Sequence, residues 1–181
     1  MTLLPSTDSY HSQQRIGVLF VCLGNICRSP SAEAVFHHKV EEAGLAHCFH
    51  IDSAGTLDWH QGNPPDARSI AHGEARGYAM RHLVSRPIVP EDFECFDDIW
   101  VMDSNNLSDV TALAPPHAKP KVQRLLTIAP HLNTLDVPDP YYGGADGFEH
   151  VLDLLESASD ALIAHYVQKH GLVSINESFV Y

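Results

Sequence analysis

The 181-residue sequence is poor in basic residues and has no apolar segment long enough to cross a membrane. Its 11 Lys and Arg residues are outnumbered by 23 Asp and Glu residues, which gives a formal net charge of −12. An acidic surface repels nucleic acids and anionic lipids at long range, and a spanning helix needs about 20 apolar residues. We therefore expect neither nucleic acid nor a membrane as partner. An anion could bind only where backbone N–H groups or an arginine concentrate positive charge locally.

Cysteine is scarce as well, and its spacing excludes the common metal motifs. Cys22, Cys27, Cys48 and Cys95 form no C-x-x-C pair, and the 13 histidines include no H-E-x-x-H. These spacings are typical of zinc sites, so we expect no metal and no other cofactor. A chain of this length builds a core without disulfides, and residues 1–14 show no signal-peptide pattern. We therefore expect free thiols in a reducing, cytoplasmic compartment.

Short apolar runs alternate with helical patterns between residues 15 and 170. Strands are predicted at residues 15–22, 50–54, 98–102 and 122–126, and helices at 29–44, 66–77, 104–113 and 148–170. This alternation indicates a single-domain, three-layer α/β fold: a four-stranded parallel sheet of flavodoxin-like order 2-1-3-4 with helices on both faces. Residues 1–14 and 171–181 are expected to be terminal extensions. Ligands in such folds bind beyond the carboxyl ends of the strands.

The loop after the first predicted strand, C-L-G-N-I-C-R-S at residues 22–29, has the composition of an anion-binding turn. Backbone N–H groups wrapped at a helix N-terminus form a positive, anion-sized hollow. Gly24 permits close approach, and Asn25 tolerates the left-handed region better than most residues. The planar guanidinium of Arg28 can bind two phosphate oxygens at once. These features suit a dianion in spite of the negative net charge.

Cys22 begins this loop and is the candidate nucleophile. The donors that hold an anion also favour a thiolate, and a thiolate that faces a bound phosphate can attack phosphorus in line. Ser29, the expected N-cap of the next helix, could also donate a hydrogen bond to the sulfur. A lone cysteine at a strand end is often a small buried hydrophobe, but C-x5-R between a buried strand and a helix start favours catalysis.

The segment V-C-L-G-N-I-C-R-S-P resembles the phosphate loop of the low-molecular-weight protein tyrosine phosphatases. Further similar segments are D-S-A-G-T (52–56), G-N-P-P-D-A-R-S (62–69), E-D-F (91–93), M-D-S-N-N-L (102–107) and D-P-Y-Y-G-G (139–144). They occur in the family's order over about residues 16–170. The resemblance implies a metal-independent phosphotyrosine phosphatase that forms a phosphocysteine on Cys22. Phosphate would be bound by Arg28 and by the loop residues Leu23, Gly24, Asn25, Ile26, Cys27 and Ser29.

The resemblance also implies a proton donor and the walls of a cleft. Taken alone, Asp139 between two prolines is best interpreted as a turn residue, but the family carries its general acid and base here. Trp59, Tyr141 and Tyr142 would form aromatic walls of a slot too deep for phosphoserine. In the family, a cysteine at the position of Cys27 can form a disulfide with the nucleophile under oxidation. A buried cysteine that only fills space in the core is an equally good interpretation of Cys27.

One segment departs from the family pattern. Where the family commonly has His-x-Ala-Arg, this chain has L-V-S-R at residues 83–86, and His82 stands one position early. The family histidine helps to fix the phosphate-loop asparagine, supported by the aspartate that matches Asp103. Two outcomes are therefore open: the contacts around Asn25 differ from those of the family, or His82 reaches Asn25 by a local shift. Asp103 could instead be mainly a helix cap. His82 is not assigned to the site.

Three other functions stay open at this point. An arsenate reductase of the same fold needs two further cysteines near each other, and Cys95 has no close partner in sequence. An arginine phosphatase relative typically has Thr where this chain has Ile26. A non-catalytic phosphopeptide-binding module would leave the set of Cys22, Arg28 and Asp139 unexplained. The expected partner is a tyrosine-phosphorylated protein, and the chain itself is expected to be a monomer or a weak homodimer through its paired tyrosines.

Overall fold

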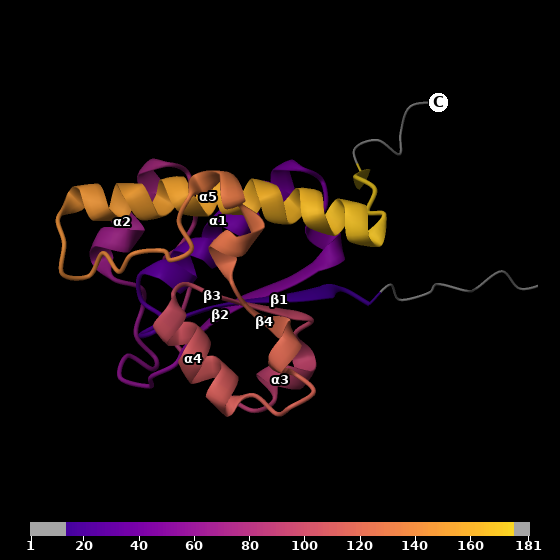
Figure 1. Ribbon diagram of the computed structural model, residues 1–181. Coiled ribbons are helices and arrows are strands. Elements are labelled where there is room, and N and C mark those ends of the chain that lie inside the picture. Colours follow the sequence, from indigo (N-terminus) through magenta and orange to yellow (C-terminus); the bar gives the residue numbers. More distant parts are fainter. Residues whose placement is uncertain (1–13, 176–181) are drawn as a thin grey trace, which may run out of the picture.

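Four parallel strands form the sheet at the centre of the computed structural model, which describes residues 14–175 (Figure 1). Their order is β2-β1-β3-β4 and every pairing is parallel, which confirms the predicted sheet. The strands are β1 (Ile16–Cys22), β2 (Phe49–Gly55), β3 (Asp98–Val101) and β4 (Val122–Arg124). Because all four run the same way, their carboxyl ends meet at one edge, where Cys22 and Gly55 lie paired.

Helices cover both faces of the sheet, as predicted (Figure 1). On one face lie α1 (Arg28–Glu42), α2 (Ala67–Ala75) and α5 (Ala145–His170), and on the other lie α3 (Asp92–Cys95) and α4 (Ser104–Leu113). Short 3-10 turns occupy Ala46–Cys48, Lys119–Lys121, Leu125–Ile128 and Pro130–Leu132. Along the described residues, no helix is long and apolar enough to span a bilayer.

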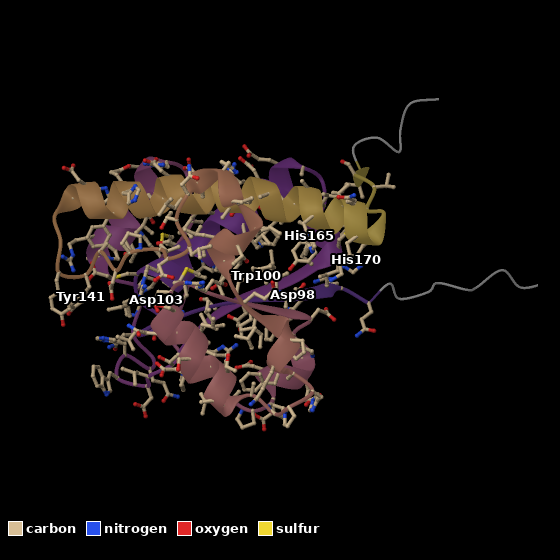
Figure 2. All side chains as sticks on the ribbon, in the orientation of Figure 1. Asp98, Trp100, Asp103, Tyr141, His165 and His170 are labelled. Carbon is tan, nitrogen blue, oxygen red and sulfur yellow. The ribbon has the colours of Figure 1, made fainter. Side chains whose placement is uncertain are left out.

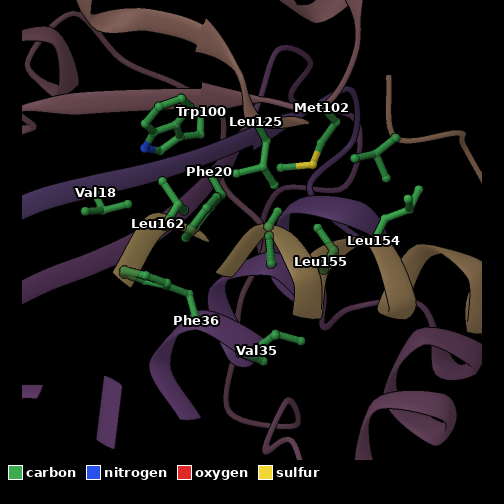
Figure 3. Packing of buried hydrophobic residues seen from close by; sticks show 14 of the residues in the cluster. Val18, Phe20, Val35, Phe36, Trp100, Met102, Leu125, Leu154, Leu155 and Leu162 are labelled. Carbon is green, nitrogen blue, oxygen red and sulfur yellow. The ribbon is translucent and has the colours of Figure 1, made fainter. Parts of the chain in front are cut away.

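Strand β1 is buried on both sides and divides the core in two. Side chains alternate across a strand, so Val18 and Phe20 pack towards α1 and α5, while Leu19 and Val21 pack towards α3 and α4. Figure 3 shows Phe20 among side chains of the first cluster, including Phe36. Both faces of β1 are therefore anchored by apolar contacts, and its carboxyl end is held rigidly.

The predicted N-cap of the first helix is wrong. Helix α1 begins at Arg28 with Cys27 at the capping position, and no side-chain hydrogen bond caps it. The hydroxyl of Ser29 is instead engaged by Asn25 and Cys22, so the loop decides where this helix begins. The cap at Asp103 is observed, since its carboxylate accepts the N–H of Asn106.

Two further boundaries differ from the sequence patterns. Helix α5 begins at Ala145, three residues before its apolar stripe, and ends at His170 with Gly171 in the left-handed region, a common helix stop. Strand β4 ends at Arg124 because the chain turns into a 3-10 helix at Leu125. Most of the predicted extensions, residues 1–14 and 171–181, lie outside the described residues.

Candidate active site

The carbonyl groups of the loop after β1 point outward. They accept hydrogen bonds from the surrounding chain: Cys22 from Thr56 N–H, Leu23 from Leu57 N–H, Gly24 from the Ser85 hydroxyl and Ile26 from Asp66 N–H. A trans peptide carries its C=O and N–H on opposite sides. The N–H groups that follow these four carbonyls therefore face the inside of the loop, as an anion site requires.

Gly55, at the end of β2, allows this close approach. A Cβ atom at this position would lie 2.8 Å from the carbonyl oxygen of Leu23 and 3.1 Å from the amide nitrogen of Asn25. Any larger residue would push the loop away from the sheet edge. The glycine of the D-S-A-G-T segment is thus explained by its contact with the loop.

Asn25 is the internal support of the loop. It is buried and has a positive φ of 54°, which matches the tolerance expected of asparagine. Its Nδ2 donates to the hydroxyls of Ser29 (2.8 Å) and Ser53 (3.0 Å), and its Oδ1 accepts the backbone N–H of Arg86 (3.0 Å). Ser29 Oγ in turn lies 3.1 Å from Cys22 Sγ. The loop conformation is therefore coupled directly to the sulfur.

The contacts of Asn25 answer the question raised by the missing family histidine. Its amide is held by Ser53 and by the backbone of Arg86, two contacts that the sequence did not assign. His82 instead lines a separate hollow beside Leu83 and His37. The signal for Ser53 was present in the D-S-A-G-T segment, but its partner could not be known without the parallel pairing of β1 with β2.

Arg28 is buried beneath the loop, with its side chain 3% exposed. Its Nη1 donates to Asp103 Oδ2 (2.6 Å) and to the carbonyl of Val137 (3.0 Å), and its Nη2 lies 3.4 Å from Asp139 Oδ2. These contacts fix the plane of the guanidinium. Asp103 thus has two partners, since its other oxygen caps α4.

Asp139 lies across the cleft from the loop and is 40% exposed. Its Oδ1 accepts the backbone N–H of Tyr141 at 3.0 Å, which holds the carboxylate near Arg28. The aspartate therefore stands where both solvent and a bound ester could reach it.

One cleft of about 250 Å³ brings together most of the predicted site residues. Its lining comprises Cys22, Leu23, Gly24, Ile26, Cys27, Arg28, Leu57, Trp59, His60, Asp139, Tyr141 and Tyr142. Asn25 and Ser29 are not on the lining because they are buried behind it. Leu57 and His60 were missed by the sequence reasoning, although both neighbour motif residues.

The aromatic residues stand at the mouth of this cleft. Trp59 is 76% exposed and Tyr142 is 93% exposed, while the ring of Tyr141 packs edge-on against Tyr142 and lies under the guanidinium of Arg68. Figure 2 shows Tyr141 and Asp103 at one end of the molecule, with Asp98 and His170 towards the other. The cleft therefore opens at the carboxyl edge of the sheet.

The second cysteine of the loop, Cys27, is buried and forms no disulfide. Burial raises the pKa of its thiol to about 12. Cys27 is therefore a neutral thiol at physiological pH. Within residues 14–175, no group of three or more His, Cys, Asp or Glu side chains is arranged to hold a metal ion.

A cysteine at the base of inward-facing amides and beside an arginine can attack a bound phosphate. The neighbouring carboxyl group can give its proton to the leaving group. That is the chemistry of a cysteine-dependent phosphatase. A family model described as low molecular weight phosphotyrosine protein phosphatase matches residues 17–172. The chain belongs to this family.

Individual relatives agree with this assignment. A low molecular weight protein-tyrosine-phosphatase of Streptomyces coelicolor is 45% identical over 150 residues, which cover 81% of this chain and 91% of the relative. The crystal structure of YfkJ from Bacillus subtilis is 36% identical with a TM-score of 0.82, covering 86% of this chain and 97% of that one. A drosophila arginine phosphatase is 33% identical with a TM-score of 0.76, covering 82% and 96%.

Proposed function

We propose that the protein hydrolyses phosphotyrosine through a phosphocysteine intermediate on Cys22. The observation that carries the proposal is the convergence of Cys22, Arg28 and Asp139 on one cleft whose base is a ring of inward-facing amides. The amides and Arg28 would supply the positive charge that the equatorial phosphate oxygens need in the transition state.

The proposed reaction has two in-line steps. In the first, Cys22 Sγ forms a bond to phosphorus while the bond to the tyrosine oxygen breaks, and Asp139 gives its proton to that oxygen. In the second, Asp139 takes a proton from water, the water oxygen bonds to phosphorus, and the sulfur leaves as thiolate. The Ser29 hydroxyl, 3.1 Å from the sulfur, would stabilise the thiolate in both steps.

The shape of the cleft supports an aromatic substrate. Trp59 and Tyr142 project from its rim, so a phenol ring would pack between them while its phosphate reaches the loop. The expected partner is a tyrosine-phosphorylated protein. The exposed rings of Tyr141 and Tyr142 also support a weak homodimer, and the proposed location is cytoplasmic.

The positions of the remaining cysteines disfavour arsenate reduction. Cys48 directly precedes β2, and Cys95 closes α3 just before β3. Both therefore lie at the amino edge of the sheet, whereas Cys22 ends β1 at the carboxyl edge. A seven-residue strand spans roughly 20 Å, far more than the reach of a disulfide relay.

Hydrolysis assays with matched variants test the proposal. Wild type, Cys22→Ser and Asp139→Asn are compared on p-nitrophenyl phosphate with chelator, and wild type then on phosphotyrosine and phosphoarginine peptides. We expect turnover that survives the chelator, is abolished in Cys22→Ser, falls strongly in Asp139→Asn and prefers phosphotyrosine. A folded wild type without turnover would overturn the proposal, and a preference for phosphoarginine would replace the substrate class.

A further inference from the structure

A row of hydrogen bonds connects Cys22 to a half-buried carboxylate on the far side of the loop. Glu33, on α1, lies with its Oε2 2.5 Å from the hydroxyl oxygen of Ser53. Ser53 Oγ accepts from Asn25 Nδ2, and the same amide nitrogen donates to Ser29 next to the sulfur. Three side chains therefore separate the carboxylate from the nucleophile.

Each group in this series of hydrogen bonds has a defined role as donor or acceptor. The two hydrogens of Asn25 Nδ2 are directed at the oxygens of Ser53 and Ser29. Each serine then keeps its own hydroxyl hydrogen for its other neighbour. An ionised Glu33 has no hydrogen to offer, so Ser53 must donate to it. On the other side, the hydrogen of Ser29 is left for Cys22 Sγ or the carbonyl of Ala54.

We infer that Glu33 is a positioning residue for the site: its ionised carboxylate fixes the Ser53 hydroxyl as a donor, which orients the Asn25 amide and, through Ser29, the environment of the Cys22 sulfur. The inference rests on the proposed function for its catalytic meaning, but the geometry it describes exists without turnover. When Glu33 is protonated, it competes with Asn25 Nδ2 as a donor to Ser53 Oγ, and the Ser53 hydroxyl is no longer fixed as a donor.

The surroundings of Glu33 bring its change of protonation state into the physiological pH range. Burial is the largest influence and raises the pKa of Glu33 to about 7; the Ser53 hydrogen bond lowers it, nearby Asp52 raises it and Arg86 lowers it. Arg86 lies between Asp52 and Asp92, to which it donates from both ends of its guanidinium. Other titratable groups line the hollow beside Glu33: His37, His38 and Glu41 of α1, and His82 of the segment after α2.

The hydroxyl of Ser53 is the hydrogen-bond donor that the structure records for the Glu33 carboxylate. Leu83 lines the same hollow as Glu33 and packs against the first core cluster. Its side chain brings no polar group to the carboxylate. Through Ser53, Glu33 is tied to Asn25 by a single side chain.

The side-chain amide resonances of Asn25, measured by NMR between pH 5.5 and 8.5, test the inference without substrate. We expect them to titrate with a midpoint near the pKa of Glu33 in wild type and in the control Glu41→Gln, and to stay flat in Glu33→Gln. Flat resonances in wild type, or the same titration in Glu33→Gln, would overturn the inference; the second result would assign the titration to a neighbouring histidine.

A kinetic measurement separates positioning from plain packing. For p-nitrophenyl phosphate, we expect wild type and Glu33→Gln to have equal kcat/KM at pH 5.5, where Glu33 is neutral in both. At pH 8.5 wild type should be about fivefold faster, the ratio expected when a charge-assisted hydrogen bond replaces a neutral one. A ratio independent of pH would contradict the inference. If wild type is inactive but its Asn25 amide resonances still change with pH, only the proposed function is contradicted.

Discussion

Asp103 binds Arg28 through one carboxylate oxygen, at 2.6 Å, and caps helix α4 through the other, at 2.7 Å from the N–H of Asn106. One side chain therefore sets the start of a helix on one face of the sheet and the orientation of the arginine below the loop. The ion pair is largely shielded from solvent, so it is only weakly screened by salt.

Replacing Asp103 separates these two contributions. Asparagine is as good an N-cap as aspartate, so the stability lost in Asp103→Asn, about 3 kcal/mol, reports the buried ion pair alone. In the same variant kcat/KM should fall about tenfold, because Arg28 loses its anchoring charge. Asp103→Ala should lose in addition about 1 kcal/mol of unfolding free energy. Equal activity of Asp103→Asn and wild type would show that the ion pair does not orient Arg28.

Oxidation of Cys22 should be captured by Cys27. A sulfenic acid on Cys22 condenses with the thiol of Cys27 to give a disulfide and water, and both side chains line the same cleft. Because burial raises the pKa of Cys27 to about 12, the condensation should accelerate as pH rises from 6 to 9. Mass spectrometry after peroxide treatment should find the linked peptide and activity restored by dithiol.

The matched variant Cys27→Ala distinguishes protection from packing. Without the second thiol, Cys22 should proceed to the sulfinic acid, and activity should stay lost after dithiol treatment. Full recovery of Cys27→Ala would mean that Cys27 serves only to fill space.

The stability of the protein should depend on Glu33 in a defined pH window. The folded-state pKa of Glu33 is raised from 4.5 to about 7 by burial, so the unfolded chain loses this proton first as pH increases. The free energy of unfolding should therefore fall from about pH 4.5 to 7 relative to Glu33→Gln, by at most about 3 kcal/mol. Urea denaturation of both proteins at several pH values measures this difference, and parallel curves would contradict the raised pKa.

Replacing Tyr166 tests a contribution of the core to stability without changing the active site. Its hydroxyl accepts the indole N–H of Trp100 at 3.0 Å and donates to Asp98 at 2.9 Å, and Figure 2 shows Trp100 and Asp98 away from Tyr141. Tyr166→Phe should lower the free energy of unfolding by about 1–3 kcal/mol because the buried indole of Trp100 and the half-buried Asp98 lose a partner, with kcat unchanged. A variant with lowered kcat and full stability would refute this separation of core and site.

The fold was predictable because its signals are local. The continuous apolar run of β1 and the alternation of strands with helices define a parallel sheet, and the structure confirms its order. The start of α1 was not predictable from capping preferences, because Ser29 is engaged by Asn25 and Cys22 rather than by the helix.

The loop residues of the site were also predictable, since C-x5-R is a contiguous pattern. Its supports were not: Ser53 and Arg86 meet Asn25 from segments 28 and 61 residues away in sequence. Their contacts depend on strand register and on the path of the chain after α2, which side-chain types alone do not specify.

The most direct test of the account is to trap the phosphorylated enzyme. Asp139→Asn is mixed with p-nitrophenyl phosphate, whose leaving group needs little protonation, and quenched in alkali within one turnover. We expect one phosphate on the peptide that contains Cys22, because the first step proceeds without Asp139 and the second does not. The Cys22→Ser variant should carry none, because it lacks the nucleophile. Turnover without a phosphocysteine, or phosphate on another residue, would contradict the account.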